Sequence, residues 1–332
     1  MGRSDGREAK AFEEFWSWWS GAKDRVAQAI GDRTIEGLVA EISGRVNALD
    51  KAMAWELAKG QNSRHAFCLS PEGNAETRPI ALRWLASAPA ADATWEYHAS
   101  RQPHQLGRLL VGGQDIELEE MRAIADWEDS RELLNVRLSH PAFASVPKQA
   151  SMQIAFLFLD GLLGEDCVER WIGKVDVSEE PFAGRTPTEL KSEVERCSAA
   201  ATRDKWGLAQ RADRKGTQAI VLANTALKRI DFPFASTLVV VSIGLGIEQL
   251  SKGKPSGLDE AEDELTEALE KTGAAYAGRV TERSRRLFYF VAAEGEAATK
   301  LVEFWAKAHK AWSPRLEVKN DPKWTFRTAL FG

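Results

Sequence analysis

The run Leu287-Phe-Tyr-Phe-Val291 is the feature that most constrains the fold. An unbroken row of aromatic and β-branched residues is typical of a central β-strand. Apolar residues recur at helical spacing on both sides of it, between 258 and 269 and again between 296 and 309. Further strands are expected at 238–243, 275–281 and 315–319. The order from residue 238 is therefore β-α-β-β-α-β, which is the split, ferredoxin-like arrangement.

A looser version of the same order is expected in the N-terminal half. There the pattern predicts strands and helices at 65–70, 75–88, 94–99, 133–138, 148–163 and 174–178. We therefore predict an α+β chain of two tandem ferredoxin-like (βαββαβ) units. The first unit is elaborated by N-terminal helices and by a hairpin insertion at Gly112-Gly113. A chain of 332 residues has the usual length for two domains.

The domain boundary is expected where the composition turns polar, after Pro181, Gly184 and Pro187. We predict an N-terminal α+β domain at 1–185 with a Trp-rich first helix. A helical connector follows at 186–216, and the C-terminal ferredoxin-like domain occupies 217–332.

Charge and hydropathy exclude some partners. The net charge is −5, so no general attraction to DNA or to an anionic membrane is expected. RNA is disfavoured for the same reason, but a local basic patch leaves RNA binding as an open alternative. The longest apolar runs, at 154–163 and 237–245, are shorter than the roughly 18 residues that span a bilayer. Residues 1–10 are polar and carry no signal-peptide pattern. The sequence therefore predicts a cytoplasmic protein.

With these elements in place, residues from about 220 to 324 resemble the family called domain of unknown function 695 (DUF695). Two motifs carry the likeness, Arg285-Arg-Leu-Phe-Tyr-Phe-Val291 and Asp321-Pro-Lys-Trp324. The N-terminal half resembles what precedes this domain in uncharacterised bacterial two-domain proteins, through Phe15-Trp16, Leu157-Phe-Leu-Asp160 and Gly164-Glu165. The fold is similar in outline to the bacterial regulator of ribonuclease E activity. This resemblance implies partner binding and no catalytic residues.

Tryptophans and arginines supply the candidate binding residues. Twelve tryptophans stand against three tyrosines, and Trp16, Trp18 and Trp19 gather in the first helix. Such rings anchor either a core or a partner interface. Arg283 and Arg285 lie at the tip of a predicted hairpin, where they either contact a phosphate or only solubilise the turn.

Catalytic and metal chemistry has little support in the sequence. The three cysteines form no CxxC, and the five histidines form neither HExxH nor HxH, so we predict no metal and no cofactor. His98 and His140 end predicted strands. Together with Asp160 they are weak candidates for an acid–base cluster. The alternative is that both are solvated imidazoles at strand ends.

These observations predict a protein-binding or regulatory module without catalysis, whose partner is another protein. Its oligomeric state stays open. Two alternatives remain at this stage. One is an enzyme with an unrecognised site between the domains. The other is a regulator of an RNA-processing enzyme.

Overall fold

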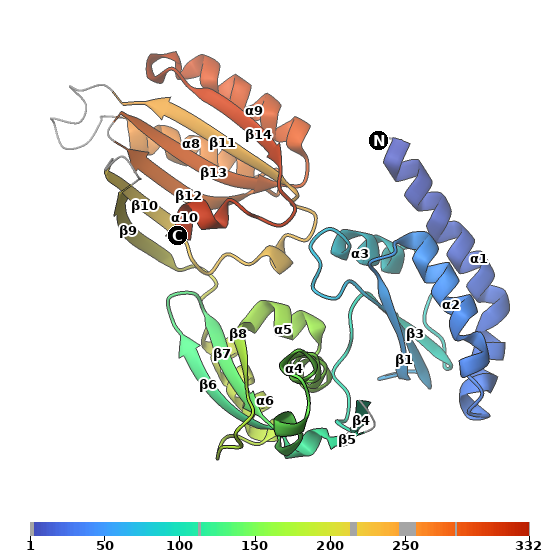
Figure 1. The fold of residues 1–332 in the computed structure, drawn as a ribbon. Coiled ribbons are helices and arrows are strands. Elements are labelled where there is room, and N and C mark those ends of the chain that lie inside the picture. Colours follow the sequence, from blue (N-terminus) through green and yellow to red (C-terminus); the bar gives the residue numbers. More distant parts are fainter. Residues whose placement is uncertain (1–2, 112–113, 213–217, 246–256, 283, 332) are drawn as a thin grey trace. The chain divides into compact units, whose positions relative to one another are not determined.

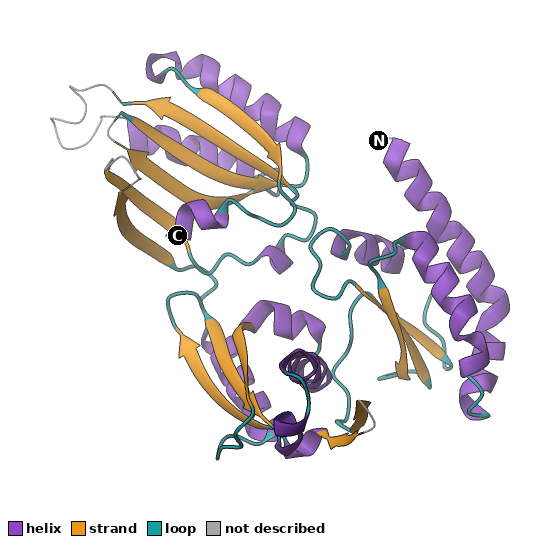
Figure 2. Ribbon diagram, in the orientation of Figure 1, coloured by secondary structure: helices purple, strands orange, loops and turns teal. Residues whose placement is uncertain are grey.

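The computed structural model describes residues 3–111, 114–212, 218–245, 257–282 and 284–331. The chain is mixed α+β, as predicted, and it divides into two compact units (Figures 1 and 2). Unit 1 comprises Met1–Trp127 and Leu133–Ala199, and unit 2 comprises Glu128–Glu132 and Ala200–Gly332. No helix within the described ranges is long and apolar enough to cross a membrane.

The first part of unit 1 packs helices on a small sheet. Its elements are α1 (Arg3–Gly31), α2 (Glu36–Leu49), β1 (Ala54–Lys59), β2 (His65–Ser70), α3 (Arg78–Ala86) and β3 (Trp95–His98). The strand order is β1-β2-β3, with β1 antiparallel and β3 parallel to β2. The helices carry apolar residues every three or four positions, and the core they form with the sheet is rich in aromatic rings, including Phe15, Trp19 and Trp84.

The second part of unit 1 builds a separate sheet. Its elements are the hairpin β4 (Arg108–Val111) and β5 (Gln114–Glu117), a 3-10 turn (Leu118–Glu120), β6 (Arg122–Glu128), β7 (Leu133–Ser139), a 3-10 turn (Pro141–Ser145), α4 (Lys148–Leu163), α5 (Glu165–Trp171), β8 (Ile172–Ser178) and α6 (Pro187–Ala200). The sheet order is β6-β7-β8, with β7 and β8 parallel. The α4–α5 segment connects these two parallel strands, as a helical crossover does.

The structure corrects the expectation of a ferredoxin-like unit in this half. The strands expected to share one sheet fall into two sheets of three, β1-β2-β3 and β6-β7-β8. The reason lies in the segment that follows β3. It leaves its sheet and runs along α4, where the His104 amide donates to the Gly161 carbonyl at 2.8 Å and the Glu165 amide donates to the Arg101 carbonyl at 3.0 Å.

Unit 2 is a six-stranded sheet with helices on both faces. Its elements are β9 (Trp206–Ala212), β10 (Gln218–Asn224), a 3-10 turn (Arg229–Asp231), β11 (Thr237–Gly244), α8 (Leu258–Glu270), β12 (Ala275–Glu282), β13 (Arg285–Ala292), α9 (Gly295–Ala308), a 3-10 turn (Lys310–Trp312), β14 (Arg315–Asn320) and α10 (Arg327–Phe331). The strand order is β14-β11-β13-β12-β10-β9, and neighbouring strands are antiparallel.

From β11 to β14, the elements follow the predicted β-α-β-β-α-β order. Alternate residues of β11 point to opposite faces of the sheet. Val239 and Val241 pack with α8 and α9, whereas Leu238 and Val240 join the cluster that contains α10 (Figure 2). This burial on both faces explains why the strand is apolar throughout.

The described part of the predicted helical connector, residues 186–212, contains two elements of different kinds. Helix α6 belongs to unit 1, and strand β9 pairs with β10 at the edge of the unit 2 sheet. Most β9 side chains are exposed, so the strand has no alternation of apolar and polar residues for a sequence pattern to detect.

Candidate functional site

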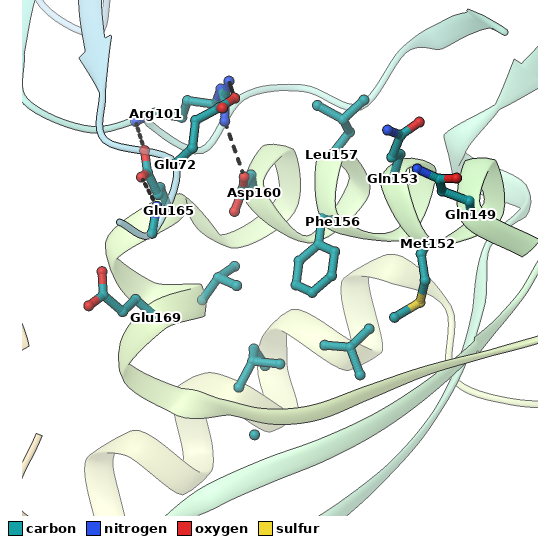
Figure 3. A pocket seen from close by; sticks show the side chains of 15 residues that line it. Glu72, Arg101, Gln149, Met152, Gln153, Phe156, Leu157, Asp160, Glu165 and Glu169 are labelled. Atoms are coloured by element: carbon teal, nitrogen blue, oxygen red, sulfur yellow. Dashed lines mark hydrogen bonds and ion pairs between the residues drawn. The ribbon is translucent and has the colours of Figure 1, made fainter. Parts of the chain in front are cut away.

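A cavity of about 780 Å³ lies in unit 1, along the outer stripe of α4 (Figure 3). Helix α5, the start of β8 and the loops after β2 and β3 complete its wall. The residues that line it are Glu72, Gly73, Arg101, Gln149, Met152, Gln153, Phe156, Leu157, Asp160, Glu165, Val168, Glu169, Ile172, Gly173 and Val175. The volume falls within the usual range for a small-molecule site.

Helix α4 is apolar on almost every side, and that composition predicts a helix buried on most sides. The structure departs from this expectation. Ile154 and Phe158 are buried, but Phe156 is 44% exposed and Leu157 is 42% exposed. Both line the cavity, and Phe156 shares its side of the helix with Met152, four residues before it. An apolar helix stripe thus stays uncovered along a hollow in the surface.

One half of the cavity wall is apolar. Figure 3 shows Phe156 and Met152 extending from α4 into the hollow. The facing wall carries aliphatic side chains from α5 and β8, namely Val168, Ile172 and Val175. An apolar ligand part placed here would be removed from water on several sides, which is favourable in proportion to the area buried.

The other half of the wall is charged and centres on Arg101, in the loop after β3. Its guanidinium lies 2.9 Å from Glu72 Oε1, 3.5 Å from Glu56 Oε2 and 3.6 Å from Asp160 Oδ2. Figure 3 shows Arg101, Glu72 and Asp160 gathered at one end of the α4 stripe. Three carboxylates thus share a single guanidinium.

Glu165, at the start of α5, connects α5 to the loops after β2 and β3 at this charged end. Its buried carboxylate accepts hydrogen bonds from Ser70 Oγ at 2.8 Å, from the Gly73 amide at 3.0 Å and from the Arg101 amide at 3.1 Å. The preceding residue, Gly164, has φ +83° and packs against Pro103, where a Cβ would lie 2.9 Å from the proline ring. Glycine therefore permits the turn that brings Glu165 under the loop.

Arg78 of α3 contacts Glu165 and two further carboxylates of α5. Its side chain is only 2% exposed and lies 2.6 Å from Asp166, 2.5 Å from Glu169 and 3.8 Å from Glu165. A buried guanidinium requires such partners, because an uncompensated charge in the interior is costly. The pairs connect the first part of unit 1 to α5.

Asp160 is the lining residue with the most altered acidity. Burial and the neighbouring Glu165 raise the pKa of its carboxyl to about 6, although Arg101 opposes the shift. A carboxyl of this kind exchanges its proton near neutral pH, and such groups in clefts are candidates for functional sites.

The structure gives the two candidate histidines separate settings. His98 Nε2 lies 3.0 Å from Glu96 Oε1, whose carboxylate also accepts three backbone amides. His140 is buried. One of its ring nitrogens lies 3.0 Å from the Glu117 carbonyl, and the other accepts the Ala142 amide. Neither lines the cavity that contains Asp160, so the structure does not bring the three candidates together there.

The three N-terminal tryptophans lie largely in the core. Trp19 is 1% exposed, and its indole donates to Tyr97 Oη at 2.9 Å. Trp16 is half-buried and stacks on Trp84 with ring centroids 4.6 Å apart. Trp18 is half-buried and donates to Glu41 at 2.8 Å. The rings thus join α1 to α2, α3 and the sheet, and Trp19 has no surface to offer a partner.

The predicted basic hairpin tip is already paired where the structure describes it. Arg285 lies 2.5 Å from Glu282, and Arg286 lies 3.0 Å from the buried Glu262. Arg283 lies outside the described residues. Arg285 and Arg286 therefore each contact a carboxylate, and a phosphate contact at this hairpin stays a prediction.

Sequence reasoning selected Asp160 but missed Arg78, Arg101, Glu165 and Phe156 as parts of one site. The sequence did hold a signal for Phe156. The helix is otherwise apolar, but one side of it carries the polar residues Gln149, Gln153 and Asp160, so that side is not expected to be fully buried. No sequence signal joins Arg78 and Arg101 to that helix, since contacts between distant segments depend on the tertiary fold.

The carboxylates of the charged end raise the question of whether they could bind a metal ion. Within the part of the chain that the structure describes, no group of three His, Cys, Asp or Glu side chains is placed to hold a metal ion. The carboxylates around Asp160 are instead distributed over two guanidiniums.

Comparison with known proteins identifies part of unit 2. Its elements from α8 to β14 place two α-helices and three strands in the order predicted from the sequence pattern. Residues 251–331 match DUF695, a family of unknown function. The match confirms the resemblance of the C-terminal part to this family. The DUF695 segment lies in unit 2, so it contains none of the residues that line the α4 cavity. None of the curated proteins matches the chain.

Proposed function

We propose that the chain is a binding and regulatory module without catalysis, and that the α4 cavity is where unit 1 binds a small amphiphilic ligand. The observation that carries the proposal is Phe156, a large apolar side chain that is 44% exposed inside a cavity of about 780 Å³. Together with Leu157 and Met152 it forms an apolar patch rimmed by polar residues, and contiguous patches of this kind often mark ligand-binding grooves. The charged end would orient the ligand, as a few polar groups do in most small-molecule sites.

The lining supports binding better than it supports catalysis. Among the described residues of the wall, the polar side chains are carboxylates, two amides and one guanidinium. An acid–base enzyme would have to use Asp160, whose pKa of about 6 suits proton transfer. The described residues of the wall include no histidine, cysteine, serine or lysine that could act with Asp160 as a nucleophile or second acid–base group.

Phe156→Ala is expected to weaken binding of the neutral apolar dye Nile red roughly tenfold, because the apolar area that the ring buries against the dye is lost. Dye fluorescence titrated against the full chain measures this change. Phe304→Ala is the matched control, since Phe304 is 74% exposed on α9 of unit 2 and is not one of the residues that line the cavity. Equal dye affinity for the two variants would contradict the proposal, as would a wild-type chain that binds no dye.

A second candidate function, binding of a partner protein, is favoured by the edge of unit 2. We propose that this unit is a ferredoxin-like sheet extended by β10 and β9, and that an extended segment of the partner adds to β9. Trp206 is 43% and Leu208 is 72% exposed on this edge strand. The opposite edge, β14, alternates charged residues at Arg315, Glu317 and Lys319, a pattern that discourages strand addition.

Leu208→Lys is expected to abolish capture of a stoichiometric partner from native lysate, because a charge on the free edge opposes strand addition. Val318→Lys on β14 is the control, since Val318 is an exposed apolar residue of the other edge strand, at 42% against 72% for Leu208. Captured proteins are quantified for wild type and both variants. A partner retained equally by the two variants binds elsewhere, and that outcome would remove this candidate.

A further inference from the structure

We propose that the ligand of the α4 cavity is a cationic amphiphile, with its ammonium or guanidinium group at Asp160 and Glu72 and its apolar body over Phe156 and Met152. This inference rests on the proposed function, because it specifies the chemical class of the ligand for the same cavity. It is carried by the imbalance of charge at one end of the cavity and by the apolar wall at the other.

The charge imbalance is explicit in the lining. Four carboxylates, those of Glu72, Asp160, Glu165 and Glu169, line the cavity with the single guanidinium of Arg101, which leaves a formal charge of −3. The guanidinium of Arg78 behind them also faces Asp166 at 2.6 Å, so it adds no surplus positive charge. An anionic ligand group would meet repulsion here, whereas a cation would meet attraction that grows as water is excluded.

The existing pairs leave room for a second cation. Arg101 approaches Glu72 at hydrogen-bonding distance but lies 3.5 Å from Glu56 and 3.6 Å from Asp160. The two longer separations are ionic contacts beyond a normal hydrogen bond. The Asp160 carboxylate, which lines the cavity, therefore has accepting capacity left. Figure 3 shows it next to Arg101, with Phe156 and Met152 further along the same helix.

The spacing of the two ends fits an amphiphile of modest length. Asp160 and Met152 lie eight positions apart on one helix, which corresponds to about 12 Å along its axis. Phe156 lies halfway between them. A cationic head at Asp160 would therefore direct a short apolar chain along the stripe past Phe156 to Met152, against the aliphatic side chains of α5 and β8.

The test compares three probes that share one alkyl chain, octylammonium, octanoate and neutral octanol, as competitors that displace Nile red from the full chain. Octylammonium is expected to displace the dye at roughly tenfold lower concentration than octanol, and octanoate is expected to be the weakest, because one charge-assisted contact corresponds to about a tenfold change in affinity. Asp160→Asn should remove most of the preference for the cation, whereas Asp126→Asn, at an exposed position of β6, should keep it.

The outcomes separate the two proposals. If octanol and octylammonium displace the dye equally, the ligand class is wrong while the binding cavity stands. If octanoate is the best competitor, the ligand class is again wrong, and Arg101 rather than Asp160 selects the ligand. If none of the three displaces the dye and Phe156→Ala does not weaken dye binding, the proposed function itself fails.

The same preference should depend on pH. The pKa of Asp160 is about 6 in the free protein, so the carboxyl is charged above this pH and neutral below it. The charged groups that act on it are Arg101 from the loop after β3, Glu56 from β1, Glu72 from the loop after β2, and Glu165 from α5, while the His104 ring packs against the adjacent Gly161. Octylammonium, which stays protonated throughout, should bind more weakly at pH 5 than at pH 8, and Asp160→Asn should reduce this difference. An unchanged pH profile in the variant would contradict a direct contact with Asp160.

Discussion

Arg78→Ala is expected to lower the free energy of unfolding of unit 1 by about 3–5 kcal/mol, because it removes a buried guanidinium from the buried carboxylate of Glu165 and from Glu169, whose side chain is 16% exposed. Equilibrium denaturation with urea, followed by circular dichroism, measures the change. Since the chain has two compact units, the transition of unit 1 must be assigned separately, and calorimetry of the same variant serves this purpose.

Arg83→Ala is the matched control for this prediction. Arg83 lies on the same helix and pairs with Glu8 at 2.5 Å, but its side chain is 45% exposed. An exposed pair contributes at most about 1 kcal/mol. Should Arg78→Ala not fold, Glu169→Gln provides a milder test, with an expected loss of about 1–3 kcal/mol. Equal stabilities for the Arg78 and Arg83 variants would show that the buried network does not hold α3 to α5.

Trp19→Ala is expected to destabilise unit 1 by about 3–5 kcal/mol, since it removes a fully buried indole and leaves a cavity between α1 and the sheet. The hydrogen bond from its indole to Tyr97 is lost as well. The midpoint and slope of urea unfolding measure this change, and an unaltered slope confirms that the native and unfolded states keep their compactness.

Trp18→Ala provides the comparison. The Trp18 ring is half-buried, and it contacts Glu41 and Arg45 at the surface. We expect a loss of about 1 kcal/mol for this variant. If Trp18→Ala lowered the free energy of unfolding as much as Trp19→Ala, the interface between α1 and the rest of unit 1 would differ from the one described. The pair also separates the two interpretations of the tryptophan-rich helix, since a core residue changes stability and a partner anchor changes binding.

Much of unit 2 follows from its sequence. The predicted strands and helices from residue 238 onward correspond to β11, α8, β12, β13, α9 and β14, in the same order. These elements are regular and buried on defined faces, so their side chains repeat with the period of the secondary structure. The resemblance to DUF695 lies in this part and is confirmed over residues 251–331. Strand β9 was missed because an exposed edge strand leaves no such repeat.

The arrangement of unit 1 was decided by tertiary contacts. The strands at 65–70, 94–99, 133–138 and 174–178 were predicted, but their distribution over two sheets was not, since a strand pattern does not specify its neighbour. The choice depends on the segment after β3, whose backbone pairs with Gly161 and Glu165 in place of another strand.

The sequence by itself determined the α+β class, the element order of unit 2 and the apolar character of α4, because these properties depend on residues near one another in the chain. Only the tertiary structure decided that α4 leaves Phe156 exposed, that Arg101 and Asp160 line the same cavity, and that Arg78 lies behind Glu165. These residues come from segments tens of positions apart, and their charges influence one another only across a few ångströms of poorly solvated space. Local sequence patterns do not specify the distances between such segments, so the candidate site could be recognised only in the folded structure.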